Sequence, residues 1–236
     1  MILISSDQHD YSTNYVIDWL DSLQKRFIRI NKNDPYQITF NDSQLCIHFN
    51  STNIDIGTIT GYFYRRGKIH FQQDSNSSFK TLNGISIEHS KIIDEYINYV
   101  LENKFSIGRH SDVSINKLIV LEIAKNVGFK VPASYLLEKK SDLKSLLNQC
   151  PELITKNHSN TSFFECEDGI LIAYTQPLDE INYKQIPESF SPSLFQEKID
   201  KKYEIRVFYL KEKMWSMAIF SQSNPVTEDD YRKVTN

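Results

Sequence analysis

Glycine is unusually scarce in this chain, and this scarcity limits how the protein can hold a phosphate group. Only 7 of the 236 residues are glycine, well below the usual share of about 7%. No segment matches G-x-x-x-x-G-K-[ST] or G-x-G-x-x-G, the patterns whose glycines let a backbone loop close around phosphates. The sequence therefore excludes a P-loop and a Rossmann turn, and a nucleotide bound here has to be held mainly by side chains.

The composition is that of a folded protein without a preference for polyanions. Hydrophobic residues make up 40% of the chain, and 27 Lys and Arg against 30 Asp and Glu give a net charge of −3. A nucleic-acid binder needs a clear basic surplus, so we expect no nucleic-acid partner. We also expect no membrane partner, because no apolar run approaches the roughly 20 residues of a spanning helix.

Cysteine and histidine give no sign of a structural metal or a hydrolytic centre. Three scattered cysteines suit neither a disulfide framework nor a zinc site, which together with the lack of a secretory signal predicts a cytoplasmic protein. G-x-S-x-G and H-E-x-x-H are both missing, and the six histidines show no ligand spacing. His9, between Asp7 and Asp10, could serve a metal or substrate, but a polar loop residue is the favoured interpretation.

The first half of the chain alternates strand and helix patterns, which predicts an α/β unit. Met1 to Ile4 reads as a buried strand, Ser12 or Thr13 as the cap of a helix, and Phe27 to Ile30 as a second strand. Further strands are predicted at 37–40, 45–49 and 59–64, and one face of a long helix at Ile92, Ile93, Tyr96, Ile97, Val100 and Leu101.

The second half begins near residues 108–112 and is richer in strands. Ser114 is expected to cap a helix that ends at Gly128, with Ile115, Leu118, Ile119, Ile123 and Val127 facing inward. A short helix is predicted from Ser141 or Asp142 to Leu147. Strands are predicted at 134–137, 153–156, 194–199, 204–210 and 214–220, and a hairpin at 163–174.

Charged and polar residues recur in a fixed order through this second half. Each of them alone is most simply an exposed surface residue, because surface charge is the norm. The ordered set consists of Asn116-Lys117, Leu121, Ala124, Gly128, Val131-Pro132, Lys156, Gln196-Glu197-Lys198-Ile199, Glu204-Ile-Arg206 and Asp230-Tyr-Arg232.

In this order the residues resemble the nucleotide site of the ATP-grasp superfamily of carboxylate–amine and carboxylate–hydroxyl ligases. Within it the chain most resembles the microviridin-ligase-like and grasp-with-spasm peptide maturases, the graspetide synthetases. Further likeness lies in the start of the chain (Met1 to Ser6, Asp10 to Thr13, Val16 to Leu20), in Tyr64-Arg-Arg66, Ile154-Thr-Lys156 and Tyr174-Thr175, and in Lys202 to Arg206.

The resemblance implies an α/β (α+β) chain with the ATP-grasp fold, divided into three parts. Residues 1–110 would form an N-terminal pre-ATP-grasp domain, 111–192 the central ATP-grasp subdomain, and 193–236 the start of the C-terminal subdomain, which would be incomplete in this chain. The acidic and Asn ligands of Mg²⁺ would then be expected beyond residue 236, so no metal ligand is assigned to the sequence itself.

The resemblance also assigns roles to individual residues around ATP. Lys117 and Lys156 would contact the phosphates, and Glu197, Lys198 and Ile199 would offer backbone groups to the adenine edge. Glu204 would accept hydrogen bonds from the ribose. Arg206 lies two residues further along the same predicted strand, and so on the same face as Glu204. Arg206 and Arg232 are the expected catalytic contacts to phosphate, acyl phosphate or substrate.

The implied activity is ATP-dependent ligation on a ribosomal precursor peptide, with ATP and Mg²⁺ as cofactors. Asp or Glu side chains would be activated as acyl phosphates and joined to Ser, Thr or Lys side chains as ω-esters or ω-amides. Tyr64-Arg-Arg66 could pair with acidic precursor residues, or could equally be an exposed basic strand end. A homodimer is left open.

Two other interpretations remain open at this point. The chain could be a catalytically incomplete ATP-grasp-like module that binds a peptide or nucleotide, or an unrelated α/β protein whose motifs coincide with the family's. The last interpretation requires Lys156 and Glu204 to lie far apart, because one nucleotide has to reach both.

Overall fold

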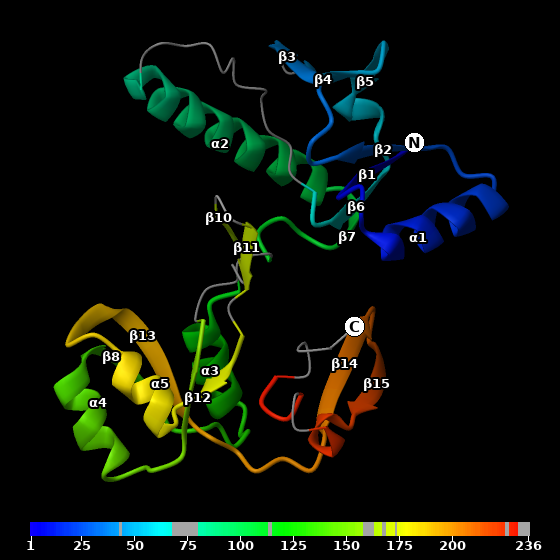
Figure 1. Cartoon of the computed structure of the whole chain (residues 1–236). Coiled ribbons are helices and arrows are strands. Elements are labelled where there is room, and N and C mark those ends of the chain that lie inside the picture. The colour runs from blue at the N-terminus through cyan, green and yellow to red at the C-terminus, as the bar shows by residue number, and fades with distance from the viewer. Residues whose placement is uncertain are drawn as a thin grey trace. The chain divides into compact units, whose positions relative to one another are not determined.

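The computed structural model describes residues 1–236 except 43, 68–79, 113–114, 158–162, 167–168, 173, 225–226 and 231–236. The chain forms two compact units, Met1–Val113 and Ser114–Asn236, and each is described by itself (Figure 1). In unit 1 the helices are α1 (Tyr11–Ser22) and α2 (Lys80–Glu102). Its strands are β1 (Ile2–Ser6), β2 (Phe27–Asn31), β3 (Gln37–Asn41), β4 (Gln44–Phe49), β5 (Thr52–Asp55), β6 (Gly61–Arg65) and β7 (Phe105–Ile107).

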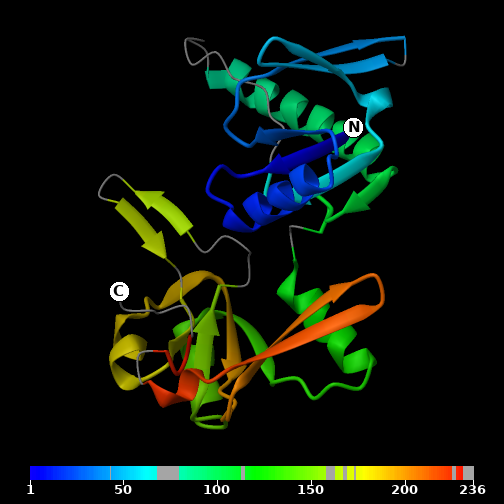
Figure 2. The same cartoon turned by 90° about the vertical axis from the view of Figure 1, so that its right-hand side faces the viewer.

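A parallel four-stranded sheet in the order β2-β1-β6-β7 organises unit 1. The crossover through α1 leads from β1 to β2 at one edge of the sheet. The crossover through α2 leads from β6 to β7 at the other edge, so the two run in opposite directions across the sheet. Because parallel crossovers are right-handed, opposite directions place the helices on opposite faces. Figures 1 and 2 show α1 on one side of the sheet and α2 on the other.

The core of unit 1 lies on the α2 side of the sheet and extends under an antiparallel meander, β3-β4-β5. Leu3 and Tyr62 of the sheet, Ile97 and Leu101 of α2 and Ile47 of the meander are all buried in one cluster. Burial of this much apolar surface is the main stabilising contribution to the unit. The predicted α/β organisation of the first half is therefore confirmed, although β5 and β7 were missed.

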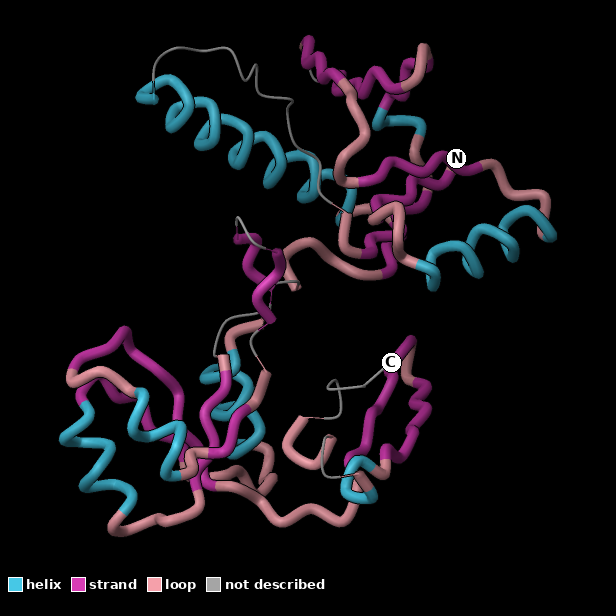
Figure 3. Tube along the Cα trace, viewed as in Figure 1, coloured by secondary structure: helices cyan, strands magenta, loops and turns pink. Residues whose placement is uncertain are grey.

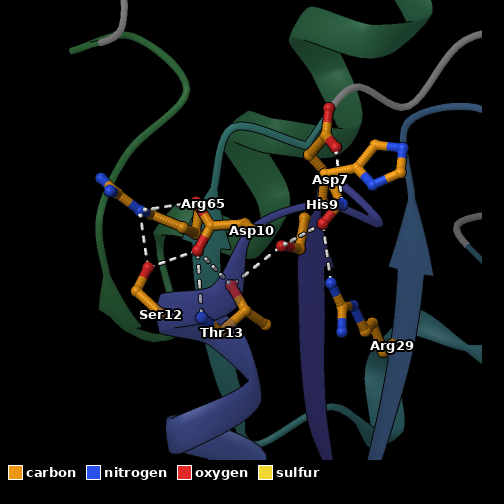
Figure 4. A network of polar contacts seen from close by, with 8 residues as sticks. Asp7, His9, Asp10, Ser12, Thr13, Arg29 and Arg65 are labelled. Atoms are coloured by element: carbon orange, nitrogen blue, oxygen red, sulfur yellow. Dashed lines mark hydrogen bonds and ion pairs between the residues drawn. The ribbon is translucent and has the colours of Figure 1, made fainter. Parts of the chain in front are cut away.

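Polar residues follow β1 at the carboxyl end of the sheet, where Figure 4 shows them in one network. Asp10 rather than Ser12 or Thr13 caps α1, and its carboxylate accepts hydrogen bonds from the Thr13 backbone N–H (3.0 Å) and from the Ser12 hydroxyl. The Arg65 guanidinium Nε lies 3.1 Å from the same carboxylate. The predicted cap was wrong because an aspartate is as good an N-cap as a serine, so the residue type does not identify the cap. The point at which the helix begins does.

The same network places His9 and the basic pair at the end of β6. His9 is exposed and bonds through its side chain to Gln8, as expected of a polar loop residue. Arg65 is held by Asp10, while Arg66 is exposed and has a positive φ of 59°. Gly67 then passes so close to β1 that an added Cβ would lie 2.0 Å from the Ser5 hydroxyl oxygen. Capture of an acidic peptide by this pair stays a prediction.

Unit 2 contains the helices α3 (Lys117–Asn126), α4 (Lys140–Leu147) and α5 (Glu180–Gln185). Its strands are β8 (Ser134–Lys139), β9 (Leu153–Lys156), β10 (Phe163–Cys166), β11 (Gly169–Ile172), β12 (Gln176–Pro177), β13 (Ser189–Glu197), β14 (Glu204–Leu210) and β15 (Lys213–Ile219). An antiparallel sheet in the order β12-β9-β13-β8 and two hairpins, β10-β11 and β14-β15, complete it (Figure 3).

The predicted inward face of α3 is wrong. Asn116 caps the helix through hydrogen bonds from the Leu118 and Ile119 backbone N–H groups, and Gly128 follows its end with a φ of 90°. Yet no described residue of α3 is buried, and Leu118, Ile119 and Ile123 are all exposed. Apolar periodicity identifies a face that favours burial, but it does not supply the surface that covers it.

Residue 193, where the third part was predicted to begin, lies inside β13. The division of the second half into 111–192 and 193–236 therefore stays a prediction. In the part of the chain that the structure describes, no helix is long and apolar enough to cross a membrane.

We predict that Asp10→Ala destabilises unit 1 by about 1–3 kcal/mol, because the helix cap and the partner of Arg65 are lost together. Urea unfolding followed by Trp19 fluorescence in a Trp215→Phe background measures this. Asp18→Ala, on the exposed side of α1, is the control and should change stability by less than about 0.5 kcal/mol. An equal loss in both variants would contradict the assignment.

The same carboxylate gives a pH dependence with a defined sign. Burial acts to raise the pKa of Asp10, but hydrogen bonds from Ser12 and Thr13 and the Arg65 charge outweigh it and hold the pKa below its ordinary value. A lowered folded-state pKa contributes stability above the unfolded-state pKa, and this contribution is lost as the pH falls. The stability difference between wild type and Asp10→Asn should therefore be constant above about pH 5 and shrink progressively as the pH falls below that value.

Candidate functional site

The sheet of unit 2 has one face for the core and one for the site. Leu153 of β9 and Phe195 of β13 pack with Leu143 of α4 in a buried cluster. Side chains alternate along a strand, so the next residues, Ile154 and Gln196, point to the other face. The strand register confirms that Ile154, Gln196 and Ser134 lie side by side across β9, β13 and β8.

A pocket of about 390 Å³ opens on this second face. Four of the predicted nucleotide-binding residues line it: Lys156, Glu197, Lys198 and Ile199. The other lining residues are Pro132, Glu152, Ile154, Gln196, Asp200, Lys201, Gln222, Glu228 and Asp229. The size lies within the range of small-molecule sites, but 8 of the 13 lining residues are charged, so the walls are more polar than is usual for such sites.

Lys156 has a shifted pKa in this pocket. Its side chain is half-buried, and burial lowers the pKa of its ammonium group, which the charges of Lys117 and Lys201 lower further. Like charges held together out of water are unfavourable until an anion neutralises them. An anion bound beside these three lysines would relieve this repulsion.

Lys117 reaches this region from the first turn of α3. Its Nζ donates a hydrogen bond to the backbone carbonyl of Asn157, the residue that follows β9. This contact brings the start of α3 beside the end of the strand that carries Lys156. The two lysines predicted to share a phosphate chain therefore do converge.

The segment after β13 offers fewer backbone donors than its sequence suggests. The Glu197 N–H donates to the Ala133 carbonyl (3.0 Å), and the Lys198 N–H donates to the Glu152 carbonyl (2.9 Å). Among the described residues, the N–H of Ile199 has no hydrogen-bond partner. Of the three residues predicted to offer backbone groups to the adenine edge, Ile199 is therefore the one whose N–H has no partner among the described residues.

The side chain of Lys198 already has carboxylate partners. Its Nζ lies 3.0 Å from an oxygen of Asp229 and 3.7 Å from one of Glu228. The Asp229 hydrogen bond and charge raise the pKa of Lys198, against the opposing effect of burial. This ion pair ties residues 228–229 to the wall of the pocket.

Glu204 lies next to the pocket through shared partners. Its carboxylate accepts hydrogen bonds from Lys201 Nζ (2.6 Å) and from the Ser221 hydroxyl (3.1 Å). Lys201 both lines the pocket and affects Lys156. Lys156 and Glu204 are therefore linked by one intermediate side chain, which argues against a coincidental set of motifs.

The two arginines predicted to be catalytic are not placed in the pocket. Arg206 is exposed on β14, on the same side of the strand as Glu204, and does not line the pocket. Arg232 lies outside the described residues. Among the residues that are described, no group of three or more His, Cys, Asp or Glu is arranged to hold a metal ion.

Lys201 and Gln196 are functional candidates that sequence reasoning missed. Lys201 precedes Glu204 by three residues, and this spacing of opposite charges could have predicted that the two side chains pair. Gln196 was noted as part of the Gln-Glu-Lys-Ile run, but its side chain received no role. It is fully buried (0% exposed), lines the pocket, and its Oε1 atom has no hydrogen-bond partner among the described residues.

Structural comparison finds solved proteins with the same fold. This chain is similar to macrocyclase MdnC from Microcystis aeruginosa MRC, bound with precursor peptide MdnA, with a TM-score of 0.78 and 18% identity over 94% of this chain and 76% of that one. It is also similar to a Chryseobacterium gregarium RiPP-associated ATP-grasp ligase in complex with ADP and a leader and core peptide, with a TM-score of 0.69 and 19% identity over 98% and 72% of the two chains.

A third similar structure is ATP-grasp ligase PsnB complexed with precursor peptide PsnA2 and AMPPNP, with a TM-score of 0.68 and 11% identity over 93% of this chain and 72% of that one. No protein-family model matches the sequence, and no curated protein matches it. At these identities the likeness shows the fold. The chain has the ATP-grasp fold, and the predicted resemblance to peptide-modifying ATP-grasp ligases is confirmed at that level.

We predict that Lys201→Met raises the pKa of Lys156 towards its ordinary value, because a neighbouring like charge is removed. The pKa should stay below that of an exposed lysine, since burial is the largest cause of the shift. A pH titration of the Lys156 side-chain NMR signal measures both effects. Lys144→Met, on the exposed face of α4, is the control, and an unchanged Lys156 pKa in Lys201→Met would contradict the arrangement.

Proposed function

We propose that this protein is an ATP-dependent ligase that modifies a ribosomal precursor peptide. It activates Asp or Glu side-chain carboxylates as acyl phosphates and joins them to Ser, Thr or Lys side chains, forming ω-esters or ω-amides. The ATP-grasp fold supports the reaction class, and the peptide complexes of MdnC and PsnB support the substrate class. The observation that carries the proposal is the half-buried Lys156 ammonium, whose pKa is lowered beside Lys117 and Lys201.

The pocket supplies what a nucleotide requires without a glycine loop. Lys117 and Lys156 bind the phosphates, and lysine suits this task because its ammonium is a compact charge on a long stem. The Ile199 N–H serves the base edge. The Glu204 carboxylate accepts hydrogen bonds from the ribose hydroxyls. It can do so with or without its hydrogen bond from Lys201, because an ionised carboxylate can accept several hydrogen bonds.

The reaction divides into phosphoryl transfer and acyl transfer. A peptide carboxylate attacks the γ-phosphorus of ATP, ADP leaves, and a hydroxyl or amine then attacks the acyl carbon and displaces phosphate. The protein contributes mainly by positioning the reactants and neutralising charge, which is where phosphoryl-transfer enzymes gain most of their rate. Lys117 and Lys156 supply positive charge for this, and Mg²⁺, when bound, would supply further positive charge to the phosphates.

Arg206 and Arg232 are the proposed contacts to the transferred group. A guanidinium binds two phosphate or carboxylate oxygens at once, which a lysine cannot do. Arg206 shares a strand face with Glu204, so a ligand that reaches the carboxylate lies beside the guanidinium. We also propose that the partner is a precursor peptide with acidic and Ser, Thr or Lys residues, and that the protein acts in the cytoplasm.

The deciding experiment has a binding arm and a turnover arm. Calorimetry with ADP and with AMPPNP tests the pocket, and coexpression with each short reading frame rich in Asp, Glu, Ser and Thr beside the gene tests the chemistry. The proposal requires nucleotide binding and a peptide that loses one water per bond formed, detected by mass spectrometry. Nucleotide binding without turnover of any such peptide would instead identify a binding module.

We predict that Lys156→Ala weakens ADP binding roughly 10- to 100-fold, because a charge-assisted hydrogen bond to phosphate is lost. Lys144→Ala, on the exposed side of α4, is the matched control and should bind ADP as the wild type does. Calorimetric titration measures both. Unchanged affinity in Lys156→Ala would show that the phosphates bind elsewhere.

Binding should also be coupled to proton uptake by Lys156. Phosphate charge favours the charged ammonium and so raises a pKa that is lowered in the free protein. At about pH 9, binding of the nucleotide should therefore be accompanied by uptake of a fraction of one proton by Lys156. The affinity for the nucleotide should fall as the pH rises further. Titrations in buffers of different ionisation enthalpy measure the uptake. Lys156→Arg, which keeps its charge at these pH values, should lose most of it.

A further inference from the structure

A line of large apolar side chains runs along α1 on the side that faces away from its own packing. The residues are spaced four apart and so form one ridge: Tyr11, Tyr15, Trp19 and Leu23. Their exposed fractions are 76%, 72%, 70% and 58%. Single apolar residues at a surface are ordinary, whereas a contiguous group of them is typical of an interaction site.

The opposite side of α1 is apolar as well. Thr13 is buried there, and Val16, Ile17 and Leu20 are half-buried beside it. A helix that covers a sheet at the surface of a protein normally has a polar outer side. With apolar side chains on both sides, α1 has the pattern of a helix that is covered twice, once by its own sheet and once by a partner.

A narrow polar strip borders the ridge along one side. It consists of Asn14, Asp18 and Asp21, which their spacing of four and three residues brings into one line. Asn14 accepts a hydrogen bond from Arg29 Nη1 at 2.8 Å. The exposed carboxylates of Asp18 and Asp21 form no ion pair with any residue that the structure describes. A partner that covers the ridge therefore meets two uncompensated negative charges at its border, and cations placed there would complement them.

A ridge of residues spaced four apart is the kind of surface that packs into the groove of another helix. From Tyr11 to Leu23 this ridge is about 18 Å long, or roughly three turns. Tyrosine and tryptophan are also among the residues that contribute most to binding at interfaces. We propose that this face of α1 binds an amphipathic helix of another polypeptide, whose apolar side is bordered by Lys or Arg residues that face Asp18 and Asp21. The surface lies in unit 1 and does not depend on the nucleotide pocket.

A second copy of this chain fits the face less well. Antiparallel packing of two α1 helices about a two-fold axis sets the same border of the ridge against itself. The carboxylates of Asp18 and Asp21 would then face the same two carboxylates of the other copy, and like charges repel. These charges disfavour an anionic lipid surface in the same way.

The test uses the full chain and two synthetic peptides of about 15 residues, long enough to form a helix. Both peptides carry the same leucine face, bordered by lysines in one and by glutamates in the other, which are similar helix formers. Fluorescence of Trp19 in a Trp215→Phe background reports binding, because Trp19 lies in the ridge and is then the single tryptophan. The lysine peptide should bind roughly tenfold more tightly than the glutamate peptide.

Variants of the two aspartates decide whether charge selects the partner. Asp18→Lys/Asp21→Lys should reverse the preference, so that the glutamate peptide binds more tightly. The neutral variant Asp18→Asn/Asp21→Asn should bind both peptides equally, and it replaces the reversed variant if that one does not fold.

Variants of exposed tyrosines decide whether the ridge is the contact. Tyr15→Ala should weaken binding of the lysine peptide roughly tenfold, because an aromatic residue of the interface is lost. Tyr99→Ala is the matched control, since Tyr99 is 66% exposed on α2 and lies outside the ridge. It should leave binding of the lysine peptide unchanged.

The outcomes bear on this inference and leave the nucleotide site untouched. A lysine-peptide preference that reverses with the two aspartates supports it. Equal binding of both peptides by the wild type, or an unchanged Trp19 emission, overturns it. Self-association in sedimentation velocity that Tyr15→Ala abolishes identifies a second copy as the occupant and overturns it as well. Binding to vesicles of phosphatidylcholine and phosphatidylserine that Tyr15→Ala abolishes overturns it in favour of a lipid surface.

Discussion

An ammonium group held half out of water beside two others is unfavourable, and Lys156 occupies that position at the end of β9. The fold holds it there because Leu153, three residues earlier, is buried in the core of the sheet. Alternation along the strand then directs Ile154 and Lys156 to the opposite face, where the pocket lies. Packing on one face of the sheet therefore fixes the charge on the other, and the chemistry of the site depends on this coupling.

Much of the fold could be predicted from residue patterns. Three of the four strands of the parallel sheet, β1, β2 and β6, were predicted from short apolar runs, and β14 was predicted with its observed bounds. Capping was less predictable, because Asp10, Ser12 and Thr13 all suit an N-cap, and the choice depends on where the chain turns after β1. The burial of α3 failed for a different reason: periodicity describes a helix by itself, whereas burial depends on what packs against it.

The candidate site divides in the same way. The resemblance identified Lys156 as a candidate, and only its position at the end of a strand, which brings it into the pocket, could be predicted from the local sequence. The free N–H of Ile199 could not, because the N–H groups of its two predecessors are used by Ala133 and Glu152, which come from other segments. Gln196 was missed because nothing in a sequence tells which atom of a buried amide is left without a partner. Such properties arise from tertiary contacts and are visible only in three dimensions.

The residues proposed to contact the nucleotide lie on elements that differ in how much of their apolar surface is buried. The proposed contacts Lys156, at the end of β9, and Ile199, just after β13, adjoin a sheet with its own buried core. The other proposed contacts, Lys117 on α3 and Glu204 on β14, belong to elements on which Ile123, Val207 and Phe208 are exposed. Elements with few buried apolar contacts open at low free-energy cost. A ligand that joins both kinds would therefore order α3 and β14 against the sheet, and part of its binding free energy would go into that ordering. On this argument Lys156 and Ile199 would meet a nucleotide from positions that are already fixed, while contacts to Lys117 and Glu204 would determine how much of unit 2 becomes rigid on binding.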